Sequence, residues 1–86
     1  MLIIATHDVA DVQHWFDSPK RAEFFGPRGI QATAFRDPAG GTKTCAVLID
    51  TPDLETFQKA LAEPEAAEAE AYDGVDPDTI QIFVAE

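Results

Sequence analysis

His7 lies at the end of a predicted buried strand, a position where catalytic and ligand-binding side chains are often found. His7 follows the apolar run over residues 2–5 and precedes Asp8. It alternates in phase with Ile3 and Ala5, so these three side chains share one face of the strand. If that face lines the cavity of a dimer, a neutral imidazole there can act as a base or orient a ligand. The alternative is a half-buried histidine bonded to the backbone, and the sequence leaves both open.

The other reactive side chains are expected to be structural or solvated. His14 falls on the side of its helix away from Trp15, so it is predicted to lie at the surface. Cys45 lies in an apolar strand with no base that can be placed beside it, which predicts an inert core thiol. Arg21 and Arg28 could bind a carboxylate, but solvated side chains are expected. Two His and one Cys on separate elements lack the spacing of metal ligands, so we predict no metal and no cofactor.

Hydrophobic periodicity and turn signals divide the chain into six elements. The strands are predicted by apolar or alternating runs. The first helix is predicted to start at an Asp11 N-cap, and the second at a Thr51 N-cap followed by Pro52. Each is predicted to break where a later proline restarts it, and the glycine at position 74 is predicted to end the second helix. The predicted strands are residues 2–5, 30–36, 44–49 and 79–85, and the predicted helices are residues 11–25, broken at Ser18-Pro19, and 52–72, broken at Pro64.

The order strand, helix, strand, strand, helix, strand predicts an α+β, ferredoxin-like βαββαβ domain over residues 1–86. Its sheet is expected to be four-stranded and antiparallel, in the order 4-1-3-2, with two kinked helices on one face. The strands at 2–5 and 44–49 are apolar on both faces, as central strands should be. In the outer strands, residues alternate between the two faces of the sheet, so the hydrophobic periodicity agrees with the predicted strand order.

The face of the sheet without helices predicts a partner. It would expose Phe35, Phe83 and part of both central strands, and monomers rarely leave such an apolar patch in water. We therefore expect a homodimer whose two sheets face each other. The outward side chains could instead line a small-molecule pocket between the sheets, since amides and a hydroxyl among aromatic rings suit one. These candidate ligand-binding residues are Gln31, Thr33, Phe35, Gln81 and Phe83.

Charge excludes two classes of partner. The chain has a net charge of −10. All of this charge lies in residues 50–86, which contain eleven acidic residues and a single basic residue, Lys59. Nucleic acid and anionic membranes would be repelled by that half. We interpret the acidic run as a solvated helix face. With no signal peptide or apolar span and a single cysteine, a cytoplasmic protein is expected.

The layout resembles the dimeric α/β-barrel superfamily, which shares the ferredoxin-like fold. The resemblance is carried by Asp-Val-Gln-His-Trp at the first helix, Phe-Arg-Asp-Pro in the hairpin and Asp-Leu-Glu-Thr-Phe at the second helix. It is greatest with small antibiotic-biosynthesis-monooxygenase-like or uncharacterised members. This resemblance implies a dimer that binds a small apolar or aromatic molecule between its facing sheets, with oxygenation, isomerisation or cyclisation as its candidate reactions and His7 as the best candidate base. A non-catalytic dimer, whose sheet face serves assembly only, is the alternative.

Overall fold

The sheet has the predicted topology. A computed structural model describes residues 1–85 and contains an antiparallel four-stranded sheet in the order β2-β3-β1-β4, which is 4-1-3-2 counted from the other edge. The central strands are β1 (Leu2–Asp8) and β3 (Thr44–Asp50), and the edge strands are β2 (Gln31–Phe35) and β4 (Gln81–Val84). Ala5 pairs with Val47 on one side and with Ile82 on the other. The ferredoxin-like fold is therefore confirmed.

Each predicted helix is broken where its proline restarts it. The first consists of α1 (Val12–Asp17) and α2 (Lys20–Phe25), followed by a 3-10 turn, η1 (Gly26–Arg28). The second consists of α3 (Leu54–Ala62) and α4 (Pro64–Asp73). The carboxylate of Asp11 caps α1 as predicted, whereas α3 is capped by Asp53 and not by Thr51, whose hydroxyl donates to the Asp53 carbonyl instead. Gly74 ends α4 in the left-handed conformation at φ 72°.

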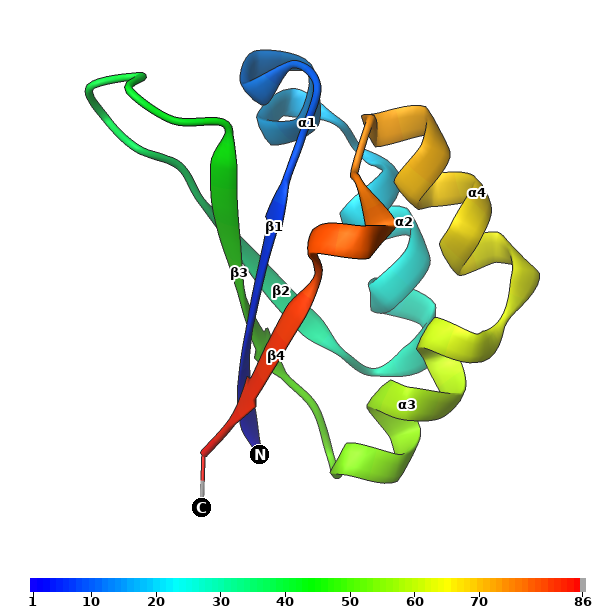
Figure 1. Cartoon of the computed structure of the whole chain (residues 1–86). Coiled ribbons are helices and arrows are strands. Elements are labelled where there is room, and N and C mark those ends of the chain that lie inside the picture. Colours follow the sequence, from blue (N-terminus) through cyan, green and yellow to red (C-terminus); the bar gives the residue numbers. More distant parts are fainter. Residues whose placement is uncertain (86) are drawn as a thin grey trace.

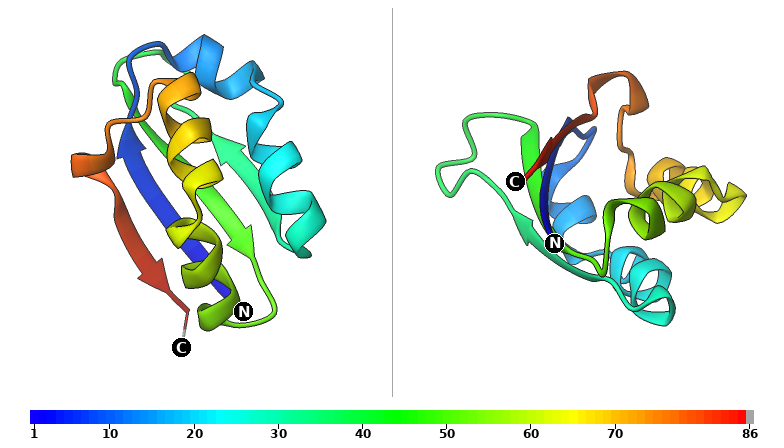
Figure 2. Two further views of the ribbon diagram at one scale, coloured as in Figure 1. Left: turned by 90° about the vertical axis from the view of Figure 1, so that its right-hand side faces the viewer. Right: turned by 90° about the horizontal axis from the view of Figure 1, so that it is seen from below.

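All helices lie on one face of the sheet, so the molecule has two layers (Figures 1 and 2). The core between the layers includes Ile3 and Ile49 from the central strands and Trp15 and Phe57 from the helices. Arg28 forms a bidentate ion pair with Glu63, with nitrogen–oxygen distances of 2.6 and 3.1 Å. Because Glu63 lies at the break between α3 and α4, this pair ties the end of α2 to that break, and Arg28 is not simply solvated as predicted.

Two strand boundaries differ from the prediction by more than one residue. β1 continues to Asp8, so His7 lies within a strand rather than in a loop. β4 begins at Gln81 rather than at residue 79, because Pro77–Thr79 forms a 3-10 turn, η2. The Thr79 hydroxyl donates to the Asp76 carbonyl at 2.7 Å and accepts the Asp8 amide at 2.8 Å. These bonds satisfy the backbone without a strand and hold η2 against the end of β1.

Within residues 1–85, every helix is too short or too polar to cross a bilayer.

Candidate active site

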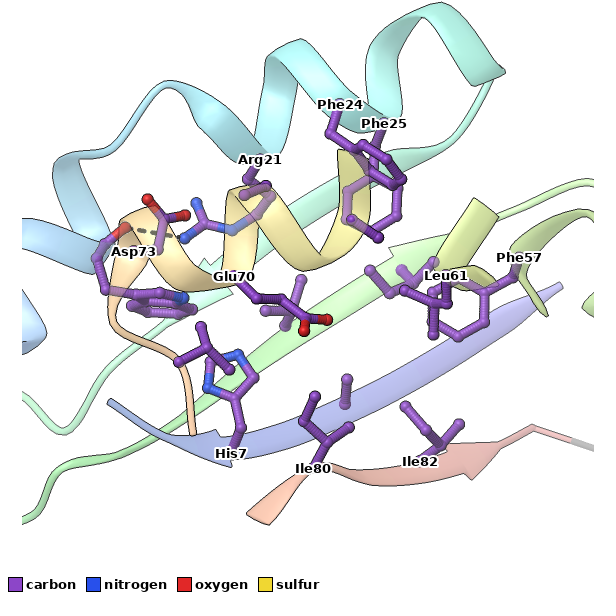
Figure 3. A pocket seen from close by; sticks show the side chains of 17 residues that line it. His7, Arg21, Phe24, Phe25, Phe57, Leu61, Glu70, Asp73, Ile80 and Ile82 are labelled. Atoms are coloured by element: carbon purple, nitrogen blue, oxygen red, sulfur yellow. Dashed lines mark hydrogen bonds between the residues drawn. The ribbon is translucent and has the colours of Figure 1, made fainter. Parts of the chain in front are cut away.

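A cavity of about 100 Å³ lies between the sheet and the helices (Figure 3). One water needs roughly 10–15 Å³ on the same kind of measure, so several waters or a small organic group would fit. Most of its walls are apolar, and the exposed side chains of Leu61 and Ile82 mark where it meets solvent. The polar lining residues are His7, Arg21, Glu70 and Asp73; the apolar ones include Ala5, Trp15, Phe24, Phe25, Val47, Phe57, Ala66, Ala69 and Ile80.

His7 faces this cavity from β1. Its side chain shares the helix-covered face with Ile3 and Ala5, is 7% exposed, and meets the Trp15 ring edge to face at a centroid distance of 5.3 Å. Burial is the main cause that lowers the pKa of His7, and Arg21 lowers it further, while Asp8 and Asp73 raise it in part. The imidazole is therefore held neutral at pH 7. Among the described residues, its Nδ1 atom has no hydrogen-bond partner, which leaves it available to a ligand.

Arg21 forms part of the wall rather than extending into solvent. Its guanidinium stacks over the Trp15 ring at 4.4 Å and donates to the Trp15 carbonyl at 3.1 Å (Figure 3). Burial lowers the pKa of Arg21, and Asp73 raises it in part. An arginine stays protonated in proteins, so the cavity contains one positive charge fixed by an aromatic face and a carbonyl.

One face of α4 supplies the two carboxylates that the sequence analysis missed. Ala66, Ala69, Glu70 and Asp73 all line the cavity at the spacing i, i+3, i+4 and i+7. Asp73 is 5% exposed, and its Oδ1 atom has no partner among the described residues. We had interpreted the acidic run as a solvated face, which is wrong for these two positions. No helical spacing singles them out, because alanine and acidic residues alternate around the whole of this helix.

The residues predicted to bind ligand lie on the other side of the sheet. All five are exposed on the face of the sheet opposite to the helices, called the open face below, and none of them lines the cavity. They are Gln31, Thr33, Phe35, Gln81 and Phe83. Their role in ligand binding stays a prediction. The cavity instead brings together a histidine from β1, an arginine from α2 and the two acids of α4.

The remaining candidates lie outside this site. His14 is exposed, and its Nε2 atom lies 2.9 Å from the Tyr72 carbonyl oxygen. Cys45 is buried, and burial raises the pKa of its thiol, so it lacks the thiolate character of a nucleophile. Residues 1–85 contain no group of three or more His, Cys, Asp or Glu side chains arranged to hold a metal ion.

Comparison with known proteins supports the fold. No protein-family model matches the sequence, and no curated protein sequence matches it significantly. Among solved structures, a protein from Deinococcus radiodurans assigned as an antibiotic biosynthesis monooxygenase matches with a TM-score of 0.65 and 16% identity, over 100% of this chain and 93% of that one. A mutant of SnoaB, a cofactor-independent oxygenase from Streptomyces nogalater, matches with a TM-score of 0.64 and 22% identity, over 99% of this chain and 91% of that one. The chain therefore has the ferredoxin-like fold of antibiotic-biosynthesis-monooxygenase-like proteins, as its sequence resemblance predicted.

Proposed function

We propose that the cavity binds a small apolar or aromatic carbonyl compound and that the protein oxygenates it without a cofactor. The observation that carries this proposal is the neutral His7 beside the fixed charge of Arg21 at an otherwise apolar cavity. Apolar pockets with a few convergent polar groups and perturbed pKa values are typical of binding and active sites. The cofactor-independent reaction of the structural neighbour SnoaB supports the same class.

The residues of the cavity suit the chemistry of a carbon acid. His7 would take a proton from the carbon beside the carbonyl, and Arg21 would stabilise the negative charge of the resulting enolate. Apolar walls strengthen that attraction because they lower the local dielectric. The enolate then donates electrons to O₂, a C–O bond forms, and loss of water from the hydroperoxide converts CH₂ to C=O. Isomerisation and cyclisation start from the same enolate.

Filling the cavity is expected to abolish binding and turnover together. Ala69 lines the cavity, so Ala69→Phe should place a ring in the space that a ligand needs. We expect this variant to lower both the affinity for 2-tetralone and its oxygen uptake by at least about 10-fold, because the loss of a well-packed ligand costs more than about 1.4 kcal/mol. Calorimetry measures binding, and an oxygen electrode measures uptake.

The matched control is Ala71→Phe, which adds the same ring to an exposed position of the same helix. It should leave both quantities unchanged. If the wild-type protein neither binds aromatic ketones nor takes up oxygen with them, the catalytic proposal is wrong, and the alternative of a non-catalytic dimer gains support.

The open face supports the proposal that two copies pair through it. Four of its large apolar side chains, Leu2, Ile4, Phe35 and Phe83, are exposed on the face opposite to the helices. Two facing sheets would bury this patch, and the added burial would stabilise a small core.

A charge on that face is expected to break the dimer. Phe83 and Tyr72 are each 54% exposed, but Phe83 lies on the open face and Tyr72 on α4. Phe83→Glu should raise the dimer dissociation constant at least about 10-fold, since an unpaired charge would be buried in the interface. Sedimentation equilibrium measures this constant. An equal effect of Tyr72→Glu, or a wild-type monomer at all concentrations, would contradict pairing through this face.

A further inference from the structure

Glu70 faces His7 across the cavity. His7 projects from β1 in the sheet, and Glu70 projects from α4 in the helical layer, so the carboxyl group and the imidazole point into one space from opposite walls (Figure 3). Ile80 and Ile82 line the same cavity beside His7, on the side of the sheet. A small molecule in the cavity would therefore meet a nitrogen on one side and a carboxyl group on the other.

The surroundings of Glu70 favour a protonated carboxyl group. Its carboxylate forms no hydrogen bond or ion pair with the rest of residues 1–85, whereas the fixed cation, Arg21, lies beside Asp73. Burial alone raises the pKa of Glu70. Glu70 also lies in the last turn of α4, where the negative end of the helix dipole disfavours a second negative charge. Asp73 thus balances Arg21, whereas no cation among the described residues pairs with Glu70, and its pKa is raised.

We propose that Glu70 is the proton donor of this site and that, with His7 as the acceptor, the cavity interconverts the ketone and enol forms of a small apolar carbonyl compound. This inference rests on the proposed binding of such a compound, but the reaction itself needs no oxygen. A neutral acid and a neutral base placed on opposite sides of a substrate are the arrangement that concerted enolisation requires.

The step balances within the site. A ring nitrogen of His7 takes the proton from the carbon beside the carbonyl, and the C–H electron pair becomes the C=C bond. The carbonyl π pair moves to oxygen, which takes the proton of Glu70. The products are the enol, a Glu70 carboxylate and a His7 imidazolium, and proton exchange with water restores both side chains. No electrons are gained or lost overall.

The rate of this reaction should have a bell-shaped pH profile. It rises as His7 becomes neutral, through a pKa that lies below the ordinary value of 6.5, and it falls as Glu70 ionises, through a pKa above the ordinary value of 4.5. The charged groups that act on His7 are Arg21, Asp8 and Asp73, and burial alone acts on Glu70.

The test is anaerobic hydrogen–deuterium exchange of 2-tetralone in D₂O, followed by proton NMR. We expect the wild-type protein to accelerate exchange beside the carbonyl, and Glu70→Gln to slow it at least about 10-fold, since general acid catalysis contributes about 10²–10⁴ in rate. Glu70→Gln should also remove the fall of the rate at high pH, which a merely structural role would not do. The matched control is Glu68→Gln, at an exposed position of the same helix, which should leave rate and profile unchanged.

The outcomes separate this inference from the proposed oxygenation. Exchange and oxygen uptake that both stay unchanged in Glu70→Gln would overturn the role of Glu70 and leave the oxygenase proposal standing. Anaerobic exchange that Glu70→Gln slows, without oxygen uptake in air by the wild-type protein, would support the acid–base pair and overturn oxygenation. If Glu70→Gln does not fold, Glu70→Asp and the pH profile of the wild-type protein decide, because a wild-type rate that does not fall at high pH contradicts the proposal.

Discussion

Replacing His7 with glutamine is expected to lower turnover of a carbonyl substrate by about 10²–10⁴, the usual contribution of a general base. Glutamine keeps a polar side chain of similar length but has no atom that accepts a proton near pH 7. Affinity for the substrate should fall much less, because most of the cavity wall is apolar and unchanged. Oxygen uptake and anaerobic exchange both measure the loss, since both begin with removal of the same proton.

The other histidine is the natural control. His14 is exposed on α1 and does not line the cavity, so His14→Gln should leave both rates unchanged. If His7→Gln keeps full activity while remaining folded, the base is another group and the assignment of His7 is wrong. A variant that loses affinity and rate in equal measure would instead indicate that His7 orients the ligand.

Replacing Trp15 with alanine is expected to lower the free energy of unfolding by about 3–5 kcal/mol, as is usual for a large aromatic side chain lost from a core. Trp15 is 2% exposed, meets His7 edge to face and supports the guanidinium of Arg21. Small domains have only about 5–15 kcal/mol of stability in total. Urea unfolding followed by circular dichroism measures the change, because the variant has no tryptophan to report by fluorescence.

An exposed aromatic residue on the same layer provides the comparison. Tyr72 is 54% exposed on α4, so Tyr72→Ala should cost less than about 1 kcal/mol. Equal losses at positions 15 and 72 would contradict the placement of Trp15 at the centre of the core. Where Trp15→Ala is unfolded in buffer, Trp15→Phe gives a smaller loss that can be measured, because it keeps one ring of the pair with His7.

The fold could be predicted because its signals are local and agree with one another. Two central strands that are apolar on both faces and two helices restarted by proline are sufficient to select the topology and the order of the sheet. The end of β1 and the start of β4 could not be placed correctly. The length of β1 depends on its neighbouring strand, since His7 pairs with Cys45 of β3. The turn η2 replaces the start of the predicted last strand because the Thr79 hydroxyl bonds to the nearby Asp76 carbonyl and to the Asp8 amide, which is distant in sequence.

The candidate site was predictable in part. His7 could be singled out from its phase with Ile3 and Ala5, but a pocket was predicted on the open face of the sheet, whereas His7 faces a cavity on the helix-covered face. Charged residues in a helix are usually solvated, so Glu70 and Asp73 could not be separated from their exposed neighbours by composition. Only the position of α4 relative to α2 determines that these two acids point inward.

The cavity is lined by β1, β3, β4 and the helical layer of a single chain. Each subunit of the proposed dimer would therefore carry a complete binding site, on the side of its sheet away from the partner. A ligand should saturate at one molecule per chain, and separating the subunits should leave that stoichiometry unchanged. Pairing through the open face would thus contribute stability to the protein while leaving its two sites independent of each other.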